Sequence, residues 1–261
     1  MNESEKNILN ILSKNPYYIK SVEDPSEEMQ LSAVKENGML LGYIKNPTEK
    51  VKWEALKSNK WAIEYIEEPD EAMCLYVVER AWNALKHIKK SNEKLIRKAI
   101  EQKGWAIQFC ENPSEELQVL AVEKDWDSIK YIDNPTDKVK LYAIKKEWNA
   151  IKYVKNPTLE MQIAAVIQSE EAVRYIDDIS EKTWIYFVIH NIKVLKYIDK
   201  NISMEKIQEV LKEKISDENI DKDYVLNFIE DEILKIDKVR FIYAYGSMKA
   251  KRILVDYKIS I

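Results

Sequence analysis

The side chains that most often carry catalysis are few in this sequence. Its 261 residues contain two histidines, His87 and His190, and two cysteines, Cys74 and Cys110. Nucleophilic catalysis needs a serine, threonine or cysteine held beside a base, and no such pairing is indicated by the motifs around these residues. Zinc-type sites need cysteines and histidines at short, fixed spacings, which the sequence lacks. We therefore predict that the protein is not an enzyme and holds no metal or cofactor.

The glycines exclude the common phosphate-binding loops. A P-loop or a dinucleotide-binding turn places several glycines close together, so that the backbone can approach a phosphate group. Gly38, Gly42, Gly104 and Gly246 never form such a cluster. We therefore expect no nucleotide hydrolysis by those routes.

Recognition by aromatic and cationic side chains is the chemistry that the sequence does indicate. Three tryptophan–lysine pairs, each with a spacing of four, are followed by a further arginine and lysine: Trp82, Lys86, Trp126, Lys130, Trp148, Lys152, Arg174 and Lys196. Residues four apart share a face of an α-helix, so stacked helices would align these side chains in a ridge. This Trp/Lys ridge could stack nucleic-acid bases or bind an acidic partner.

The same residues also have a purely structural interpretation. Each tryptophan would seal the joint between two helical repeats, and the lysine stem would lie over its ring in a cation–π contact worth about 0.5–1 kcal/mol. Trp61 and Trp105 occur one position later in the repeat and lack the same lysine partner, which weakens the ridge. The sequence favours the structural interpretation slightly and leaves both open.

Tandem repeats are the elements that position these residues. Prolines recur at multiples of 22 residues, and three other residues occupy the remaining positions of the register, so nine copies fit without insertion or deletion. The positions are Pro25, Pro47, Pro69, Ser91, Pro113, Pro135, Pro157, Ile179 and Asn201. Each copy contains two apolar segments with helical spacing, which predicts a hairpin of two helices.

The residues around each proline predict where the first helix begins. An asparagine or aspartate precedes most of the prolines, as at Asn46 and Asn112, and these residue types cap helix N-termini. Proline suits the first helical position, where no N–H partner is needed. Acids such as Glu27 and Glu115 follow two places later and offset the helix dipole. We therefore predict asparagine or aspartate caps, with the acids as capping groups and not as catalytic carboxylates.

Repeated columns predict the core. The first helix carries alanine–aliphatic pairs such as Ala121/Val122, and the second carries alanine and an aliphatic residue followed by an aromatic column, which we predict to be core and stacking positions. The aromatic column is Tyr43, Tyr65, His87, Phe109, Tyr131, Tyr153, Tyr175 and Tyr197. A hairpin of two helices of roughly two to three turns cannot bury its apolar face alone, so the copies must stack. The predicted fold is an all-α solenoid with a helical C-terminal cap.

The repeat resembles the family called domain of unknown function 4116. The resemblance rests on Asn112-Pro113-Ser114-Glu115-Glu116-Leu117-Gln118, on Ala121-Val122 and on a later Ala-Ile-x-Tyr-Ile motif, and covers about residues 15 to 200. It implies helical repeats, and it implies no particular activity because the family has none assigned.

The register divides the chain into three parts. We predict an N-terminal capping helix over 1–14, tandem repeats over 15–201, and a helical cap or small interaction module over 202–261.

The formal charge of −4, from 41 basic and 45 acidic residues, disfavours a bulk nucleic-acid or membrane binder. The sequence contains neither a signal-peptide pattern nor an apolar run of 18 residues, so we expect a cytoplasmic protein.

These observations favour a non-enzymatic scaffold that binds another protein through the extended solenoid surface. A narrower version is a phage-encoded inhibitor that blocks a bacterial defence complex in the host cytoplasm. The alternative is a nucleic-acid or nucleotide binder that uses the Trp/Lys ridge. No membrane partner is expected, and the sequence predicts no particular oligomeric state.

Overall fold

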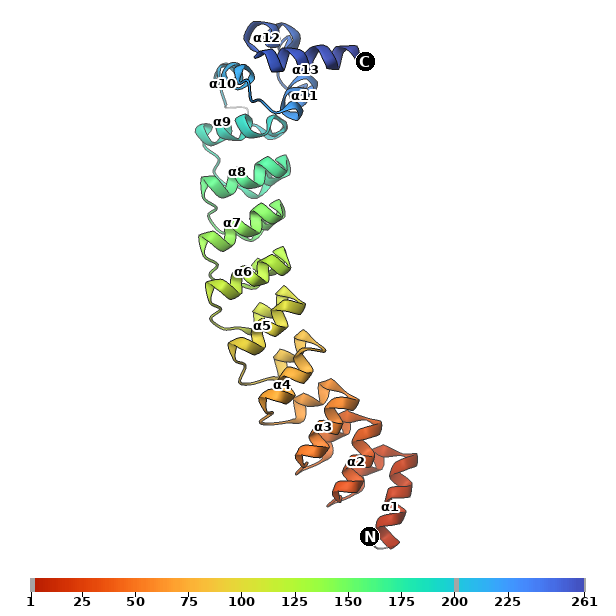
Figure 1. The fold of residues 1–261 in the computed structure, drawn as a ribbon. Helices are drawn as coiled ribbons and strands as arrows, with labels where there is room; N and C mark the ends of the chain where they lie inside the picture. Colours follow the sequence, from red (N-terminus) through yellow and green to blue (C-terminus); the bar gives the residue numbers. More distant parts are fainter. Residues whose placement is uncertain (1–2, 200–201, 261) are drawn as a thin grey trace. The chain divides into compact units, whose positions relative to one another are not determined.

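The fold is built from a repeating pair of helices. The computed structural model describes residues 3–199 and 202–260, and every regular element within these ranges is helical. An α-helix followed by a short 3-10 helix (η) recurs along the chain (Figure 1). Contacts join mainly elements that are neighbours in the sequence. The prediction of an all-α repeat protein is therefore confirmed, while the predicted segment ends at 1, 201 and 261 lie outside the described residues.

The chain forms two compact units that divide between Asn134 and Pro135. The helices of the first unit are α1 (Glu3–Lys14), η1 (Pro16–Ser21), α2 (Glu27–Glu36), η2 (Gly38–Tyr43), α3 (Glu49–Ser58), η3 (Lys60–Tyr65), α4 (Glu71–Val78), η4 (Trp82–His87), α5 (Glu93–Gln102), η5 (Gly104–Phe109), α6 (Glu115–Lys124) and η6 (Trp126–Tyr131). Within this unit α2 to α6 follow one another in chain order, each packed against the next (Figure 1).

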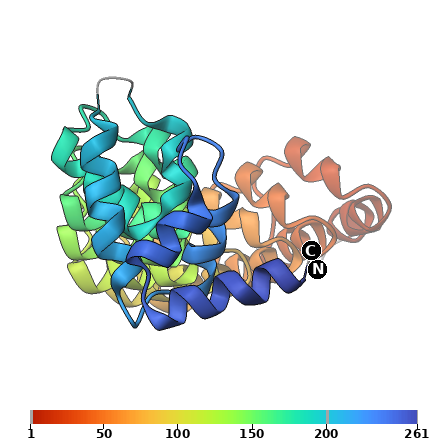
Figure 2. The ribbon, with the colours of Figure 1, turned by 90° about the horizontal axis from the view of Figure 1, so that it is seen from above.

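The second unit contains further pairs and then a run of α-helices. Its helices are α7 (Asp137–Lys146), η7 (Trp148–Tyr153), α8 (Leu159–Gln168), η8 (Glu170–Tyr175), α9 (Glu181–His190), η9 (Ile192–Tyr197), α10 (Met204–Ser216), α11 (Lys222–Glu230), α12 (Lys238–Tyr245) and α13 (Met248–Ile259). Helix α10 packs against α9 and α12, and α11 packs against α13. Figure 1 shows α10 to α13 beyond α9 at the C-terminal end of this unit, and Figure 2 shows the same helices, in blue, from above.

The second element of each repeat differs from the prediction of an α-helix of two to three turns. It is a 3-10 helix of six residues, as in η2 and η5. Its last turn closes with a bond between residues three apart, for example from Ile44 N to Leu41 O at 3.0 Å. Such helices stay short because their hydrogen-bond geometry is poorer than that of an α-helix. Each repeat therefore consists of one α-helix and one 3-10 helix.

The α-helices begin two residues later than predicted. In α4 the cap is Asp70, whose Oδ1 accepts a hydrogen bond of 2.7 Å from Met73 N. The caps of α2 to α9 are Ser26, Thr48, Asp70, Asn92, Ser114, Thr136, Thr158 and Ser180. The prolines thus precede the caps, and the predicted asparagine and aspartate caps are wrong. Those residues lie in the turn instead, where Asn156 and Asp178 adopt φ values of 50°, a left-handed conformation that asparagine and aspartate tolerate better than most residues.

The predicted alanine and aliphatic columns form the core. Ala121 and Val122 of α6 are fully buried, as are Ala106 and Ile107 of η5. The small alanine side chain lets an α-helix approach the neighbouring 3-10 helix closely. The same columns are buried in the repeats of the second unit, as at Ala165.

Candidate interaction surface

Lysine and tryptophan side chains of the 3-10 helices meet between successive repeats of the first unit. Lys130 Nζ in η6 lies 4.3 Å from the centre of the Trp105 ring in η5. Lys86 Nζ in η4 lies 5.6 Å from the centre of the Trp61 ring in η3. The tryptophans in these contacts are therefore Trp61 and Trp105. In the sequence these two residues weaken the predicted Trp/Lys ridge, because they occur one position later in the repeat. The interaction joins one repeat to the next.

The predicted tryptophan–lysine pairs within one repeat depend on an α-helical second element. A 3-10 helix has three residues per turn, so residues four apart do not share a face. Trp82, Trp126 and Trp148 each occupy the first position of their 3-10 helix and are half-buried. The Trp82 ring centre lies 6.2 Å from that of Phe109 in the following repeat. The Trp148 ring centre lies 6.4 Å from that of Tyr175. The geometric basis of the predicted pairs is thus wrong, and their role in binding stays a prediction.

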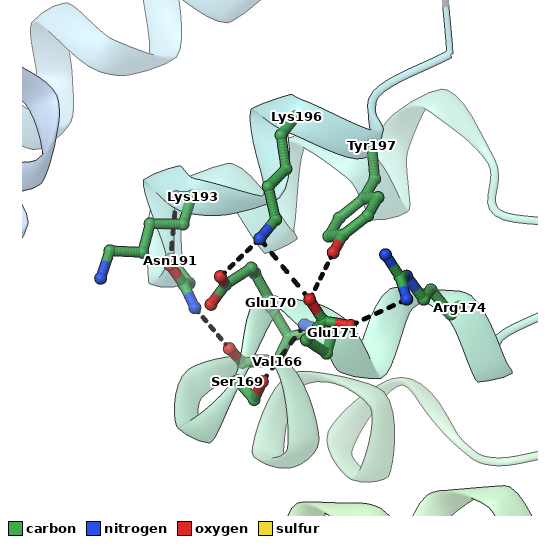
Figure 3. A network of polar contacts seen from close by, with 9 residues as sticks. All are labelled: Val166, Ser169, Glu170, Glu171, Arg174, Asn191, Lys193, Lys196 and Tyr197. Atoms are coloured by element: carbon green, nitrogen blue, oxygen red, sulfur yellow. Dashed lines mark hydrogen bonds and ion pairs between the residues drawn. The ribbon is translucent and has the colours of Figure 1, made fainter. Parts of the chain in front are cut away.

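Carboxylates pair with two cationic side chains of the second unit, Arg174 and Lys196 (Figure 3). Lys196 Nζ lies 2.8 Å from Glu170 Oε1 and 3.7 Å from Glu171 Oε1. Arg174 Nη1 lies 3.1 Å from Glu171 Oε2, and the Tyr197 hydroxyl donates a 2.8 Å hydrogen bond to Glu171 Oε1. Burial would raise the pKa of Glu170, but the hydrogen bond from Lys196, a backbone hydrogen bond and the charges of Lys196 and Lys193 together outweigh burial and hold the pKa below its usual value. Glu170 and Glu171 therefore lie where they offset the charge of Arg174 and Lys196.

In the first unit, the Asp127 carboxylate offsets the charge of Lys130. Lys130 Nζ lies 2.7 Å from Asp127 Oδ2, and Trp105 Nε1 donates a 2.6 Å hydrogen bond to Asp127 Oδ1. Burial would raise the pKa of Asp127, but these hydrogen bonds from Lys130 and Trp105 outweigh it and hold the pKa below its usual value. Lys130, Arg174 and Lys196 are therefore all paired with carboxylates, so this surface carries mixed charge.

Tyrosines at the ends of the 3-10 helices add an exposed aromatic surface. Tyr43 and Tyr65 of the first unit are 55% and 42% exposed, and Tyr153 and Tyr175 of the second are 37% and 45% exposed. We call these four residues the tyrosine row. The prediction that they lie in the core is wrong, because the aliphatic residue after each tyrosine, such as Ile44, fills the core instead. The predicted stacking role is confirmed for Tyr175, whose ring centre lies 6.4 Å from that of Trp148. In the sequence, the use of tyrosine instead of phenylalanine or leucine at these positions was the available sign of exposure, because the tyrosine hydroxyl group favours contact with water.

The tyrosine row is supported by groups from the preceding repeat and from its own helix. Lys20 Nζ of η1 lies 4.1 Å from the centre of the Tyr43 ring. A Cβ atom at Gly42 would lie 2.9 Å from the Tyr65 ring, so the absence of a side chain at Gly42 gives this ring its place against η2. In the second unit, Lys152 Nζ lies 5.0 Å from the centre of the Tyr153 ring. Aromatic and cationic groups thus lie together along the 3-10 helices of each unit.

Within 3–199 and 202–260, no group of three or more His, Cys, Asp and Glu residues is placed to hold a metal ion. Over the same residues, no helix is both long and apolar enough to cross a bilayer.

Comparisons with protein-family models, with curated proteins and with solved structures find no match. The resemblance to the domain of unknown function 4116 repeats therefore stays a prediction, resting on the motif around Pro113.

Proposed function

We propose that this chain is an α-solenoid that binds a partner protein through the surface formed by its 3-10 helices. The observation that carries the proposal is the tyrosine row, which places exposed aromatic rings at equivalent positions on a repeated core. Tyrosine offers a large contact area and a hydroxyl group at a low cost in conformational entropy, and it is enriched at protein interfaces.

The repeat architecture supports an extended binding surface. One α-helix of eight to ten residues and one 3-10 helix of six residues make too small a unit to bury an apolar face alone. Each pair depends on the next, and a stack of such pairs displays the same positions of every 3-10 helix in turn. A partner could therefore contact several repeats without a deep pocket.

The charge pattern favours a protein partner over a nucleic acid. A nucleic-acid backbone needs unpaired cations, and affinity grows with the number of phosphates that they neutralise. Lys130, Arg174 and Lys196 already contact carboxylates, which would also repel phosphates. A protein can present both signs of charge and so match a mixed surface.

Affinity capture from nuclease-treated lysate of the source cells tests the proposal. The immobilised full chain should retain a specific protein, and Tyr153→Ser/Tyr175→Ser should reduce the retained amount at least about tenfold, because two interface tyrosines together contribute more than about 1.4 kcal/mol. Tyr142→Ser/Tyr243→Ser is the matched control, since both of these tyrosines are exposed and lie outside the row.

Equal losses with the two double variants would contradict the proposal, as would retention that requires intact nucleic acid. If the retained protein belongs to a bacterial defence complex, the narrower proposal of a phage-encoded inhibitor gains support.

A further inference from the structure

A second candidate surface lies on α13, the last helix that the structure describes (Figure 2). Ile253 and Leu254 of α13 are buried, and the helix packs against α11 and α12. Met248, Val255 and Ile259 are instead 74%, 42% and 80% exposed. Helix α13 therefore carries apolar side chains on two faces, and only one of these faces is covered within 3–199 and 202–260.

The exposed apolar residues share one face of α13 with an arginine. We call these residues the α13 stripe: Met248, Arg252, Val255 and Ile259. Their successive spacings are four, three and four residues, which place all four side chains on one face of an α-helix. The core positions of a coiled-coil helix have the same spacing, and their side chains fit between those of a second helix. The pattern of the α13 stripe therefore fits a helical occupant.

Positive charge surrounds the α13 stripe. Four basic residues and one acidic residue give α13 a net charge of +3, whereas the whole chain has a net charge of −4: Lys249, Lys251, Arg252 and Lys258 against Asp256. In the part of the chain that the structure describes, none of these four cations has a carboxylate partner, unlike the cations of the 3-10 helices. Unpaired cations beside exposed apolar side chains favour an occupant that is both apolar and acidic.

The position of Arg252 separates three kinds of occupant. A second copy of α13 would bring the same positive charge and a second Arg252 into the contact, so the two copies would repel each other. An anionic membrane would attract the lysines, but inserting the apolar residues would carry Arg252 toward the hydrocarbon, where a charge is costly. An acidic helix can place a carboxylate opposite Arg252 and apolar side chains opposite Val255 and Ile259.

We propose that the α13 stripe binds an amphipathic helix of a partner protein whose apolar face is flanked by acidic residues. The α13 stripe is a second surface, made by residues other than the tyrosine row. The inference can be tested independently of the proposed function, because its test uses a peptide and not a captured protein.

Fluorescence anisotropy with the full chain and a labelled synthetic peptide tests this inference. The probe is a helical peptide of about three heptads, with leucine at the a and d positions and glutamate at the e and g positions. It should bind saturably. One control peptide has lysine in place of each glutamate, and another has serine in place of each leucine. Each control should bind at least about tenfold more weakly, because the α13 stripe needs both the acidic and the apolar side chains of its occupant.

Paired variants of the chain locate the binding. Met248→Ser/Ile259→Ser should weaken binding of the acidic peptide at least about tenfold without lowering the melting temperature, since both side chains are exposed. Leu159→Ser/Ile167→Ser is the matched control, because these exposed apolar side chains lie on α8, which contains no basic residue. This control should bind as the parent chain does.

Charge reversal within the α13 stripe completes the test. Arg252→Glu should also weaken binding at least about tenfold, because it places like charges opposite each other. Lys182→Glu on α9 makes the same charge change at another exposed position and should leave binding unchanged. The inference is overturned if the acidic peptide does not bind saturably, if either control peptide binds as well, or if the variants of the stripe bind as the parent chain does. Co-sedimentation with vesicles of phosphatidylcholine and phosphatidylserine that is lost in Met248→Ser/Ile259→Ser would assign the stripe to a membrane instead.

Discussion

At the scale of single residues, Ser128 stands where most repeats have alanine. It is fully buried in η6, and its hydroxyl oxygen finds no hydrogen-bond partner within 3–199 and 202–260. The hydroxyl lies against Gly104 of the preceding 3-10 helix. Ala106 and Ala150 occupy the equivalent position in other repeats and are fully buried too. The site is thus shaped for a methyl group, and the hydroxyl group of serine is a cost.

Replacing Ser128 by alanine should stabilise the protein. We expect Ser128→Ala to raise the free energy of unfolding by about 1 kcal/mol, because it removes a buried hydroxyl group without a partner. Urea unfolding followed by circular dichroism measures the change. Ser114→Ala is the control, because the Ser114 hydroxyl caps α6 and accepts a bond from Leu117 N, so its loss should cost about 1 kcal/mol. A lower urea midpoint for Ser128→Ala would mean that the hydroxyl group stabilises the folded chain.

The helix caps show where local sequence patterns were ambiguous. Asn112 and Ser114 flank Pro113, and both residue types are good caps, so the sequence alone permitted two starting points for α6. In the structure, Pro113 O accepts a hydrogen bond from the Gln118 side chain and the proline stays outside the helix. The side chain of Gln118 thus satisfies the carbonyl of a proline that lies outside the helix in this repeat, while α3 and α7 begin at the same later cap with lysine at that position.

A matched pair of substitutions tests the cap position in α4. Asp70→Ala should lower the free energy of unfolding by about 1 kcal/mol, because it removes the cap bond to Met73 N and a charge near the helix N-terminus. Glu68→Ala removes the same charge at the position before Pro69, which corresponds to the predicted caps of other repeats such as Asn46, and it should change stability by less than about 0.5 kcal/mol. Chemical denaturation compares the two. A larger loss of stability from Glu68→Ala than from Asp70→Ala would indicate that α4 begins earlier, at the residue before Pro69.

At the scale of the element, the 3-10 helix was the feature that the sequence could not predict. The buried positions of η7 and its cap, Ala150, Ile151 and Val154, have spacings of one and three that suit either helix type. A segment of six residues is too short for the periods of 3.0 and 3.6 to diverge clearly. The repeats, the first helices and the core columns were predictable because the 22-residue register repeats each of them many times.

Close approach between a 3-10 helix and the next α-helix gives a prediction at this scale. A Cβ atom at Gly104 would collide with the backbone oxygen of Ala121 in α6, whereas one at Gly42 would meet only the exposed ring of Tyr65. Gly104→Ala should therefore lower the free energy of unfolding by about 1–3 kcal/mol, because backbone must move. Gly42→Ala should change it by less than about 0.5 kcal/mol, since the ring can swing aside. Thermal and urea unfolding of both variants measure the difference, and similar costs would show that the approach at Gly104 is not a constraint.

At the scale of the whole molecule, the sequence identified the element that carries the candidate surface but not which side chains form it. Tryptophans drew attention, yet Trp82 and Trp148 pack against rings of the next repeat. The exposure of the tyrosine row was not predicted, because an aromatic column has the same spacing whether its rings fill the core or lie on the surface. Only the position of the following aliphatic residue, buried as at Val154, shows that Tyr153 lies outside the core.

Position-resolved cross-linking most directly tests the claim that the 3-10 helix surface binds a protein. A photoreactive phenylalanine analogue replaces Tyr153, Tyr175 or, as a control, the exposed Tyr142 on α7, and the full chain is irradiated in lysate of the source cells. The account predicts that the first two positions cross-link to the same protein and that position 142 does not. Cross-linking from 142 as efficient as from 153, or cross-links from 153 and 175 to nucleic acid and not to protein, would contradict it.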